Sequence, residues 1–446
     1  MMAGTNCSAR MESNRSFKAY PAYKDSHVDW LGLIPSNWHV KRLRYVAPMV
    51  NERVGPAGSD LPYLALEQIE GWTGRVLDSP RGEGSDDDNA QAASSVFRAG
   101  DVLFGKLRPY LAKVVLAQAD GQCSTELLVL RSRGAVTPAY LAYQVISQGF
   151  IDWINAMTYG TKMPRANPAQ VAVTGVVTPP LSDQRAIAAF LDRETARIDA
   201  LVTKKERLIE LLQEQRTGLI TRAVTKGLDP NVPMKDSGVE WVDEVPAHWN
   251  VVRADAFVRY EKNQVDPSTI LDEVVFHYSI PSVQETGDGA LEPPSGIDSA
   301  KLRIVGERLL VSKLNPRKGV VLIASEKEVP TLCSTEFVPL LGQGCDLRWA
   351  FYLFLAESTR QRLSAVVRSA TRSHQRAEVA EIVKMWHGVP PVSEQRDIAV
   401  FLDRKTARID TLVNKIRDAI DRLKEFRTSL IAAVVTGKID VREEVA

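Results

Sequence analysis

The chain has 446 residues, of which 44% are hydrophobic and 25% are charged. This composition is typical of a soluble globular protein with room for two or three domains, and it excludes a small scaffold that needs disulfides for stability. Lysine and arginine number 56 against 55 acidic residues, so the formal net charge is only +1. Any surface that binds nucleic acid must therefore arise from local clusters of basic residues.

The sequence carries no sign of export or membrane insertion. Its N-terminal segment lacks the apolar stretch of a signal peptide, and it contains no run of about 18 apolar residues. None of its four cysteines forms a C-x-x-C pair, and a chain of this length needs no disulfide framework. We therefore expect a cytoplasmic protein that does not contact a membrane.

The first predicted unit is a globular domain over residues 20–180, which follows a flexible tail over residues 1–19. Short runs of β-prone residues, such as Leu127–Leu130, are separated by glycine, proline and aspartate. A helical pattern returns over Pro138–Ala156. We expect a mixed α/β domain whose centre is rich in strands.

A single long helix is predicted over residues 181–227. Ser182 stands where an N-cap is wanted, Asp183 adds an acid to the first turn, and Gly227 lies where the helix should stop. No proline interrupts this segment. With a rise of about 1.5 Å per residue, roughly 40 residues make a rod of about 60 Å.

The second half of the chain repeats the first. The segment Pro180 to Asp229 recurs as Pro391 to Asp440, 211 residues further on, and 28 of its 50 positions are identical. A duplicated unit of this kind predicts a duplicated architecture. Two tryptophans near the start of each half follow the same spacing, and we expect all four to be core aromatics: Trp30, Trp38, Trp241 and Trp249.

The repeat predicts three further segments. These are a second mixed α/β domain over residues 228–390, a second long helix over 391–438 and a C-terminal tail over 439–446. Ser393 stands at the expected N-cap of the second helix, and Gly437 stands at its expected end.

Both helices carry an apolar stripe with a period of about 3.5 residues. Along this stripe, seven of ten positions in the first helix and nine of ten in the second are apolar. A lone helix cannot bury such a stripe, so the pattern predicts a coiled coil. The favoured partner is the other copy in the same chain, and pairing between two chains is the alternative. The predicted seam comprises Ile187, Leu191, Ile198, Leu201, Leu212, Ile398, Leu402, Ile409, Leu412 and Leu423.

Local clusters of basic residues are the positive indication of nucleic-acid binding. From Arg360 to Arg376 there are five arginines and no acid, interleaved with hydroxyl, imidazole and amide groups that suit phosphates and base edges. A shorter segment of the same kind, Thr161–Asn167, lies in the first half, although a solvated charged face would give a similar pattern. The candidate DNA-binding residues are Lys106, Arg108, Lys162, Arg165, Lys313, Arg317, Arg368, Arg372, His374 and Arg376.

No motif predicts a catalytic or metal site in this chain. Gly100–Lys106 matches the start of a phosphate-binding loop, but Leu107 stands where a serine or threonine must reach Mg²⁺. Cys-Ser-Thr-Glu occurs in both halves, at Cys123 and Cys333, yet none of the six histidines recurs at the repeat spacing to serve as a base. We expect a strand edge that carries a lysine at the first motif and a polar turn at the second.

Taken together in this order, the motifs resemble those of the specificity subunits of type I restriction-modification systems. The hallmark of that family is similar to P-L-x-x-Q-R-x-I-A-x-[FY]-L-D-x-x-[TK]-x-[RK]-I-D-x-L, after a domain that carries G-D-[VI]-L-[FI]-x-K-[LI]-R-P-[YF] and C-S-T-E-[FL]. The second copy departs from the pattern at Leu314–Arg317, where an arginine and an aromatic residue are replaced. The matching segments are Pro180–Leu201, Gly100–Tyr110, Cys123–Leu127, Pro391–Leu412 and Cys333–Phe337.

The resemblance implies an α+β protein with two tandem target-recognition domains, each followed by a long helix, and with the two helices paired as an antiparallel coiled coil. Each domain would read one half of a bipartite, asymmetric DNA target. The coiled coil would set the gap and dock two methyltransferase subunits and two restriction subunits. The chain itself would be non-catalytic and bind no cofactor, with S-adenosylmethionine, ATP and Mg²⁺ on the partner subunits.

Two other functions are open at this stage. The first is a coiled-coil scaffold whose two heads bind protein and not DNA. The second is a free-standing enzyme that uses the loop-like Gly100–Lys106 segment to turn over ATP. Residues 55–98 and 266–303 show no convincing match to each other, and we expect base-selecting side chains to diverge there.

Overall fold

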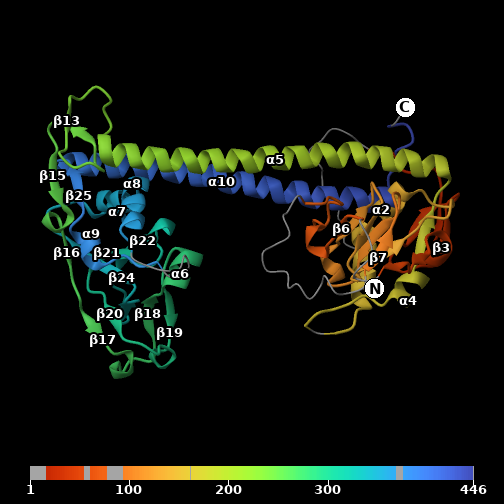
Figure 1. The fold of residues 1–446 in the computed structure, drawn as a ribbon, viewed down its shortest axis with the longest axis horizontal. Coiled ribbons are helices and arrows are strands. Elements are labelled where there is room, and N and C mark those ends of the chain that lie inside the picture. Colours follow the sequence, from red (N-terminus) through yellow and green to blue (C-terminus); the bar gives the residue numbers. More distant parts are fainter. Residues whose placement is uncertain (1–16, 55–60, 78–93, 161, 368–374, 445–446) are drawn as a thin grey trace, which may run out of the picture. The chain divides into compact units, whose positions relative to one another are not determined.

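The computed structural model describes residues 17–54, 61–77, 94–160, 162–367 and 375–444. The chain divides into two compact units. Unit 1 combines the residues up to Lys204 with those from Asp418 onward, and unit 2 comprises Lys205–Arg417. Each unit contains one strand-rich domain and part of both long helices, α5 (Leu181–Lys226) and α10 (Val392–Val435) (Figure 1).

In unit 1, two four-stranded sheets form the centre of the domain. One is antiparallel, with the order β4-β11-β8-β9, and the other has the order β5-β7-β10-β6 with β6 and β10 parallel. Two small two-stranded sheets, β1-β2 and β12-β3, complete the unit. The strands are β1 (Tyr23–Asp25), β2 (Leu33–Pro35), β3 (His39–Arg42), β4 (Met49–Val50), β5 (Arg53–Val54), β6 (Tyr63–Leu64), β7 (Ser94–Phe97), β8 (Val102–Gly105), β9 (Val114–Leu116), β10 (Gly121–Cys123), β11 (Leu127–Leu130) and β12 (Gly175–Thr178).

In unit 2, the same plan recurs with a larger second sheet. A four-stranded antiparallel sheet has the order β16-β24-β21-β22, and a five-stranded sheet has the order β17-β20-β23-β18-β19 with β18 and β23 parallel. Within this unit the five-stranded sheet lies farthest from the long helices (Figure 1). The strands are β13 (Met234–Asp236), β14 (Glu244–Pro246), β15 (Asn250–Arg253), β16 (Val258–Tyr260), β17 (Gln264–Val265), β18 (Val275–Tyr278), β19 (Ala290–Glu292), β20 (Lys301–Arg303), β21 (Glu307–Ser312), β22 (Val321–Ser325), β23 (Thr331–Cys333), β24 (Phe337–Gly342) and β25 (Trp386–Val389).

Short helices connect the strands and cover the sheets. Those of unit 1 are α1 (Leu43–Val46), α2 (Pro138–Ile146), α3 (Gln148–Ala156), α4 (Pro168–Val173), η1 (Leu66–Gln68) and η3 (Pro109–Leu111). Those of unit 2 are α6 (Ile280–Thr286), α7 (Leu347–Leu355), α8 (Glu357–Ala365), α9 (Val379–Val383), η4 (Ala254–Ala256), η5 (Pro267–Thr269), η6 (Pro294–Gly296) and η7 (Pro316–Lys318).

Each unit has one core that its domain shares with the long helices. In unit 1, Ile187 and Leu191 of α5 and Val434 of α10 belong to the same buried cluster as Trp38 and Phe150 of the domain. The corresponding cluster of unit 2 includes Val224 of α5, Leu402 of α10, Trp249 and Trp349. Of the four tryptophans expected in the core, Trp38 and Trp249 are fully buried, and Trp30 and Trp241 are partly buried against the same clusters. The helices are therefore part of each domain's hydrophobic core.

The two long helices pair antiparallel within each unit. Unit 1 holds the first part of α5 and the last part of α10, and unit 2 holds the remaining parts, which only antiparallel pairing allows. The fold class expected from the sequence is thus confirmed. Gly227 and Gly437 adopt positive φ angles of 75° and 76° just beyond the helix ends, as predicted.

Two details of the helix prediction are wrong. Both helices begin one residue before the predicted cap, because the carbonyls of Pro180 and Pro391 already accept the first helical hydrogen bonds, so Ser182 and Ser393 lie inside the first turn. In addition, Leu201 and Leu412 of the predicted seam are 41% and 42% exposed. The next residue in each helix, Val202 or Val413, is more buried, so the buried stripe runs one position later there.

The hallmark motif anchors each helix to its own domain. Gln184 is fully buried; its side-chain oxygen accepts from the Thr137 amide at 2.7 Å, and its side-chain nitrogen donates to the Pro179 carbonyl at 2.8 Å. Gln395 does the same in unit 2, with the Asp346 amide at 2.8 Å and the Pro390 carbonyl at 2.9 Å. Since a buried amide side chain must find partners, this residue fixes where each helix begins.

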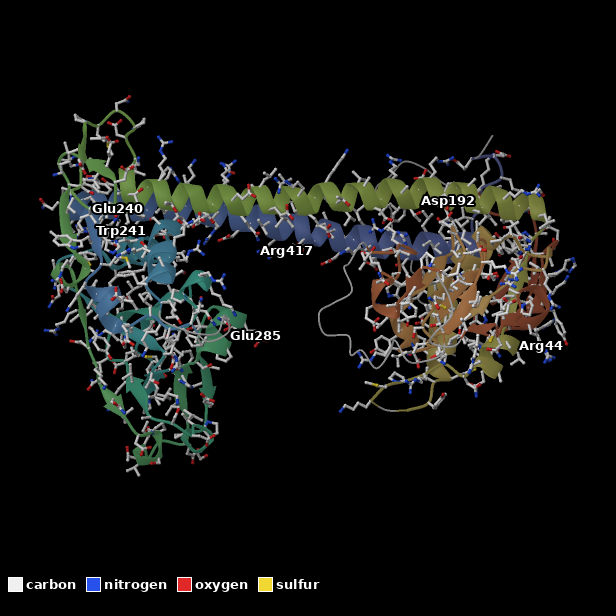
Figure 2. The ribbon with its side chains drawn as sticks, viewed as in Figure 1. Arg44, Asp192, Glu240, Trp241, Glu285 and Arg417 are labelled. Atoms are coloured by element: carbon white, nitrogen blue, oxygen red, sulfur yellow. The ribbon has the colours of Figure 1, made fainter. Side chains whose placement is uncertain are left out.

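A second anchor lies two turns further along each helix. Tyr143 donates to Asp192 on α5 at 2.7 Å, and Tyr352 donates to Asp403 on α10 at 2.8 Å. Figure 2 labels Asp192 on α5. Each aspartate belongs to the F-L-D-R segment of the repeat. These residues, which are identical in the two copies, thus have structural roles.

One ion pair between the helices is built twice from equivalent residues. In unit 1, Nε of Arg427 lies 3.0 Å from Oδ1 of Asp199, and in unit 2, Nε of Arg216 lies 3.3 Å from Oδ1 of Asp410. Arg427 also donates to the Trp72 carbonyl at 2.6 Å and is only 7% exposed, whereas the Arg216 side chain is 31% exposed. The two equivalent arginines therefore differ in burial and in the number of groups they bond.

We predict that Arg427→Ala lowers the free energy of unfolding by about 3 kcal/mol, because it leaves the partly buried Asp199 carboxylate without its partner. Arg216→Ala is the matched control, and we expect it to cost less than about 1 kcal/mol because its partner is largely in solvent. Urea denaturation of the full chain measures both. Equal losses from the two substitutions would contradict the prediction.

A buried histidine distinguishes the core of unit 2 from that of unit 1. His387 is 3% exposed, and its ring packs edge-on against Trp241, Phe257 and Phe354, with centroids 5.6, 6.1 and 5.8 Å away. Val176 occupies the equivalent position in unit 1. Loss of hydration lowers the pKa of His387 from 6.5 to about 3.

We predict that unit 2 loses stability as the pH falls from about 6.5 toward 3. His387 stays neutral in the fold, while the unfolded chain takes up its proton below its ordinary pKa, so the slope approaches 1.4 kcal/mol per pH unit, about one proton. Urea unfolding of the full chain between pH 7 and 4.5 measures this. His387→Val, which copies unit 1, removes that part of the slope; an identical slope in the variant would contradict the prediction.

Candidate nucleic-acid interface

Three sequence motifs meet at one place in unit 1. The Lys106 amide donates to the Glu126 carbonyl at 2.9 Å, and the Lys106 carbonyl accepts from the Ala166 amide at 2.8 Å. The Arg108 amide donates to the Pro164 carbonyl at 2.7 Å. The lysine turn, the Cys-Ser-Thr-Glu turn and the second basic segment are thus bonded through their backbones.

Unit 2 repeats this arrangement. The Lys313 amide donates to the Glu336 carbonyl at 2.8 Å, and the Lys313 carbonyl accepts from the Ala377 amide at 3.0 Å. The Asn315 amide donates to the Gln375 carbonyl at 2.8 Å. We call this arrangement the basic junction; it comprises residues 106–112, 123–126 and 162–166 in unit 1, and 313–319, 333–336 and 375–377 in unit 2.

A carboxylate in each basic junction holds one of the predicted DNA-binding arginines. Arg165 lies 3.3 Å from Glu126, and Arg376 lies 2.9 Å from Glu336. The arginine side chains are 41% and 63% exposed, so each ion pair orients a guanidinium that still faces solvent. Lys106 and Lys313 are half-buried, and Arg108, Lys162 and Arg317 are exposed.

The turn after each lysine has an unusual backbone. Arg108 and Ala112, with φ of 49° and 45°, flank η3, while Asn315 and Gly319, with φ of 47° and 62°, flank η7. Left-handed backbone is costly for residues such as Arg108 and Ala112, so the turn in unit 1 persists because surrounding contacts hold it, whereas Asn315 and Gly319 adopt this backbone at little cost. In both units the turn presents cationic side chains at a fixed place.

This geometry agrees with the departure seen in the second copy of the motif. Asn315 has the backbone angles and the hydrogen bond of Arg108. Arg317 lies one residue after the turn proline, at the place of Tyr110 in unit 1. The amide of Asn315 replaces a cation, so the two junctions differ in charge as well as in surroundings.

Part of the second basic cluster is structural. The guanidinium of Arg360, on α8, donates to the Arg317 carbonyl at 3.1 Å. A Cβ atom on Gly319 would lie 2.6 Å from the Arg360 side chain, so the turn and this arginine are tightly packed. Arg360 thus supports the turn. The candidates Arg368, Arg372 and His374 lie outside the described residues.

Neither catalytic alternative gains support from the local structure. Val102–Gly105 is the buried strand β8, so the Gly100–Lys106 segment forms a strand and not a phosphate-binding loop. The Ser124 hydroxyl accepts from the Glu126 amide at 3.2 Å, and Ser334 does so from Glu336, which confirms the predicted polar turn. Within the part of the chain that the structure describes, no group of histidine, cysteine and acidic residues could hold a metal ion.

Comparison with curated proteins gives the same family for each relative. Over 211 residues the chain is 26% identical to the type I restriction enzyme EcoDI specificity subunit from Escherichia coli, a match that covers 46% of each protein. It is 21% identical to the MjaVIII specificity subunit from Methanocaldococcus jannaschii, over 92% of this chain and 94% of the relative. This chain is related to the specificity subunits of type I restriction enzymes. No family model matches it.

Solved structures of specificity subunits share the fold. The crystal structure of the HsdS subunit from Thermoanaerobacter tengcongensis matches with a TM-score of 0.51 at 20% identity, over 91% of this chain and 98% of that one. A chain from work on complex assembly and conformational transition of the type I R-M system matches with a TM-score of 0.69 at 18% identity, over 90% and 98%. No helix among the described residues is long and apolar enough to span a membrane.

The side-chain partners that define the basic junction were not predicted from the sequence. The Cys-Ser-Thr-Glu motif was predicted to be a turn, but neither the contact of Glu126 with Arg165 nor that of Glu336 with Arg376 was predicted. The recurrence of all three motifs in both halves marks them as shared features of the two domains, but it does not show which side chains meet.

We predict that Cys123 and Cys333 resist alkylation in the native protein. Both side chains are fully buried, and loss of hydration raises the pKa of both thiols, that of Cys123 to about 12. Iodoacetamide at pH 8 followed by mass spectrometry measures the labelling. Both residues are expected to react fully in urea, and rapid labelling of either in the native chain would contradict the inert role.

Proposed function

We propose that this chain is the DNA-recognition subunit of a type I restriction-modification complex. Each strand-rich domain reads one half of a bipartite target, and the paired helices set the gap between the halves. The observation that carries the proposal is the basic junction, which is built twice from the same motifs, once in each unit. Two related basic sites with different surroundings suit two different half-sites.

The differing surroundings support an asymmetric target. The two central sheets of the units correspond, but the second sheet has four strands in unit 1 and five in unit 2. Arg108 in one junction is Asn315 in the other. Because base edges are read by individual side chains, such differences favour different half-sites.

In this proposal the chain is not an enzyme and binds no cofactor. Two methyltransferase subunits bring S-adenosylmethionine and methylate adenine, and two restriction subunits bring ATP and Mg²⁺. Large apolar residues on the long helices suit the docking of such subunits: Leu208 and Leu211 of α5 are each 45% exposed, and Val400 of α10 is 55% exposed.

The test is a purified complex of the full chain with its adenine methyltransferase. We expect sequencing of methylated DNA to show one split target with a nonspecific gap. Lys162→Ala should weaken binding to that target and lower the slope of log K against log salt by about one, because one phosphate contact is lost. Binding is measured by fluorescence anisotropy at several salt concentrations.

The matched control is Lys41→Ala. Lys41 is also exposed and lies in unit 1, but it is on β3 and outside the basic junction. It should keep the wild-type slope. A complex that binds DNA without sequence preference, or not at all, would overturn the proposal and favour a scaffold whose heads bind protein.

A further inference from the structure

Unit 2 carries a helix at a place where unit 1 has a single turn. Strands β6 and β18 correspond, because each pairs parallel with the strand that ends at the cysteine of Cys-Ser-Thr-Glu. After one further residue, unit 1 continues with the 3₁₀ turn η1, whereas unit 2 continues with α6. The helix is closed at its start by the Ser279 hydroxyl, which accepts from the Ser282 amide, and at its end by Gly287 with a φ of 80°.

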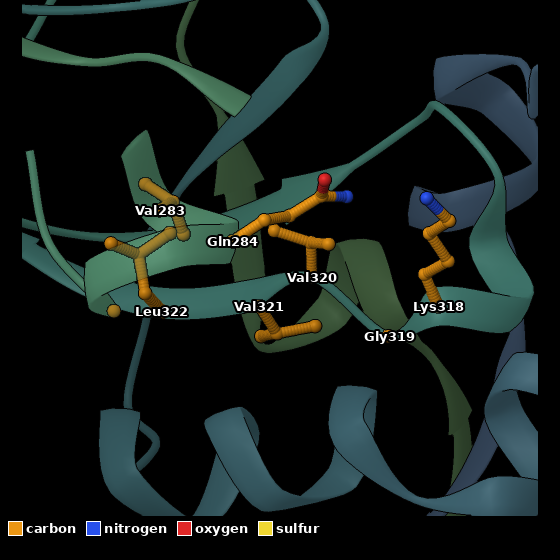
Figure 3. Close-up of a pocket in the computed structure, with 8 residues that line it drawn as sticks. Val283, Gln284, Lys318, Gly319, Val320, Val321 and Leu322 are labelled. Atoms are coloured by element: carbon orange, nitrogen blue, oxygen red, sulfur yellow. The ribbon is translucent and has the colours of Figure 1, made fainter. Parts of the chain in front are cut away.

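Between α6 and the segment 318–322 lies a cavity of about 460 Å³. Val283 forms one wall from α6, and Val320, Val321 and Leu322 contribute further apolar surface (Figure 3). Val283 is 8% exposed and belongs to the core beneath the helix, so packing fixes the position of this wall. The cavity is therefore a partly apolar surface with an open mouth.

Two polar side chains rim this apolar surface. Gln284 on α6 and Lys318 on η7 are both exposed, and Figure 3 shows the amide and the ammonium extending to the same side of the cavity, with Val320 next to the Gln284 side chain. Lys318 belongs to the basic junction. The cavity is thus continuous with the candidate nucleic-acid interface, and its cationic wall is held by the contact between Gly319 and Arg360.

These groups match the chemistry of one base pair in the major groove. A glutamine amide can bond N6 and N7 of adenine at once, and apolar side chains contact the methyl group of thymine. A lysine beside them suits the neighbouring phosphate. We propose that Gln284 and Val320 read an A·T pair in one half of the DNA target, with Lys318 on the backbone.

The inference rests on the proposed function and makes it more specific. Since α6 has no counterpart in the described part of unit 1, this contact belongs to the half-site of unit 2 alone. It also gives different roles to the two polar side chains at the rim of the cavity. Gln284 discriminates between bases, and Lys318 contributes affinity without discrimination.

The experiment uses the complex of the full chain with its adenine methyltransferase. Once the target is known from methylated DNA, competitor duplexes are prepared in which each A·T pair of both half-sites is substituted in turn. Gln284→Ala should lower discrimination at one A·T pair from about tenfold or more to within about twofold, and leave the other positions unchanged. Lys318→Ala should weaken all duplexes equally and lower the salt slope by about one.

The matched control is Gln264→Ala, a glutamine that is also exposed but lies on β17 at the edge of the same sheet and outside the cavity. It should keep every preference. If Gln284→Ala weakens all duplexes equally, or changes no preference, the inference is overturned while the proposed function stands. If the wild-type complex shows no split target, the proposed function fails and the inference falls with it.

Discussion

The structure depends on a buried amide at the start of each long helix. Gln184 and Gln395 bond backbone groups of the domain that precedes them, at a point where water cannot take their place. Each helix therefore leaves its domain in a set direction, and its apolar face continues the domain core. A rod that merely linked two domains would need no such bonds.

Much of this architecture could be predicted because the sequence contains two copies of the same unit. The duplication identifies two domains and two helices, and the apolar period identifies their pairing. The details of the seam could not be predicted in the same way. A strict 3.5-residue count placed Leu201 and Leu412 inside, but their helices also pack on the domains, and the buried stripe follows Val202 and Val413 there.

The sequence predicted which residues form the candidate interface, but not which side chains contact one another there. Basic residues were visible as clusters, yet nothing in their spacing shows that Arg360 supports a turn or that Glu126 and Glu336 orient arginines. The replacement of Arg108 by Asn315 was visible in the motif, but the left-handed backbone that these two positions share was not. Because the net charge is only +1, the local contacts that orient basic side chains decide where a polyanion can bind.

The composition of unit 1 has a consequence for biosynthesis. Its core includes Leu430, Ile431 and Val434, so the domain that leaves the ribosome first lacks part of its interior until α10 has been translated. Unit 2 is one continuous stretch and is complete earlier. The first domain therefore keeps an apolar face uncovered until a segment more than two hundred residues downstream has been translated. During translation this face would be a binding surface for chaperones.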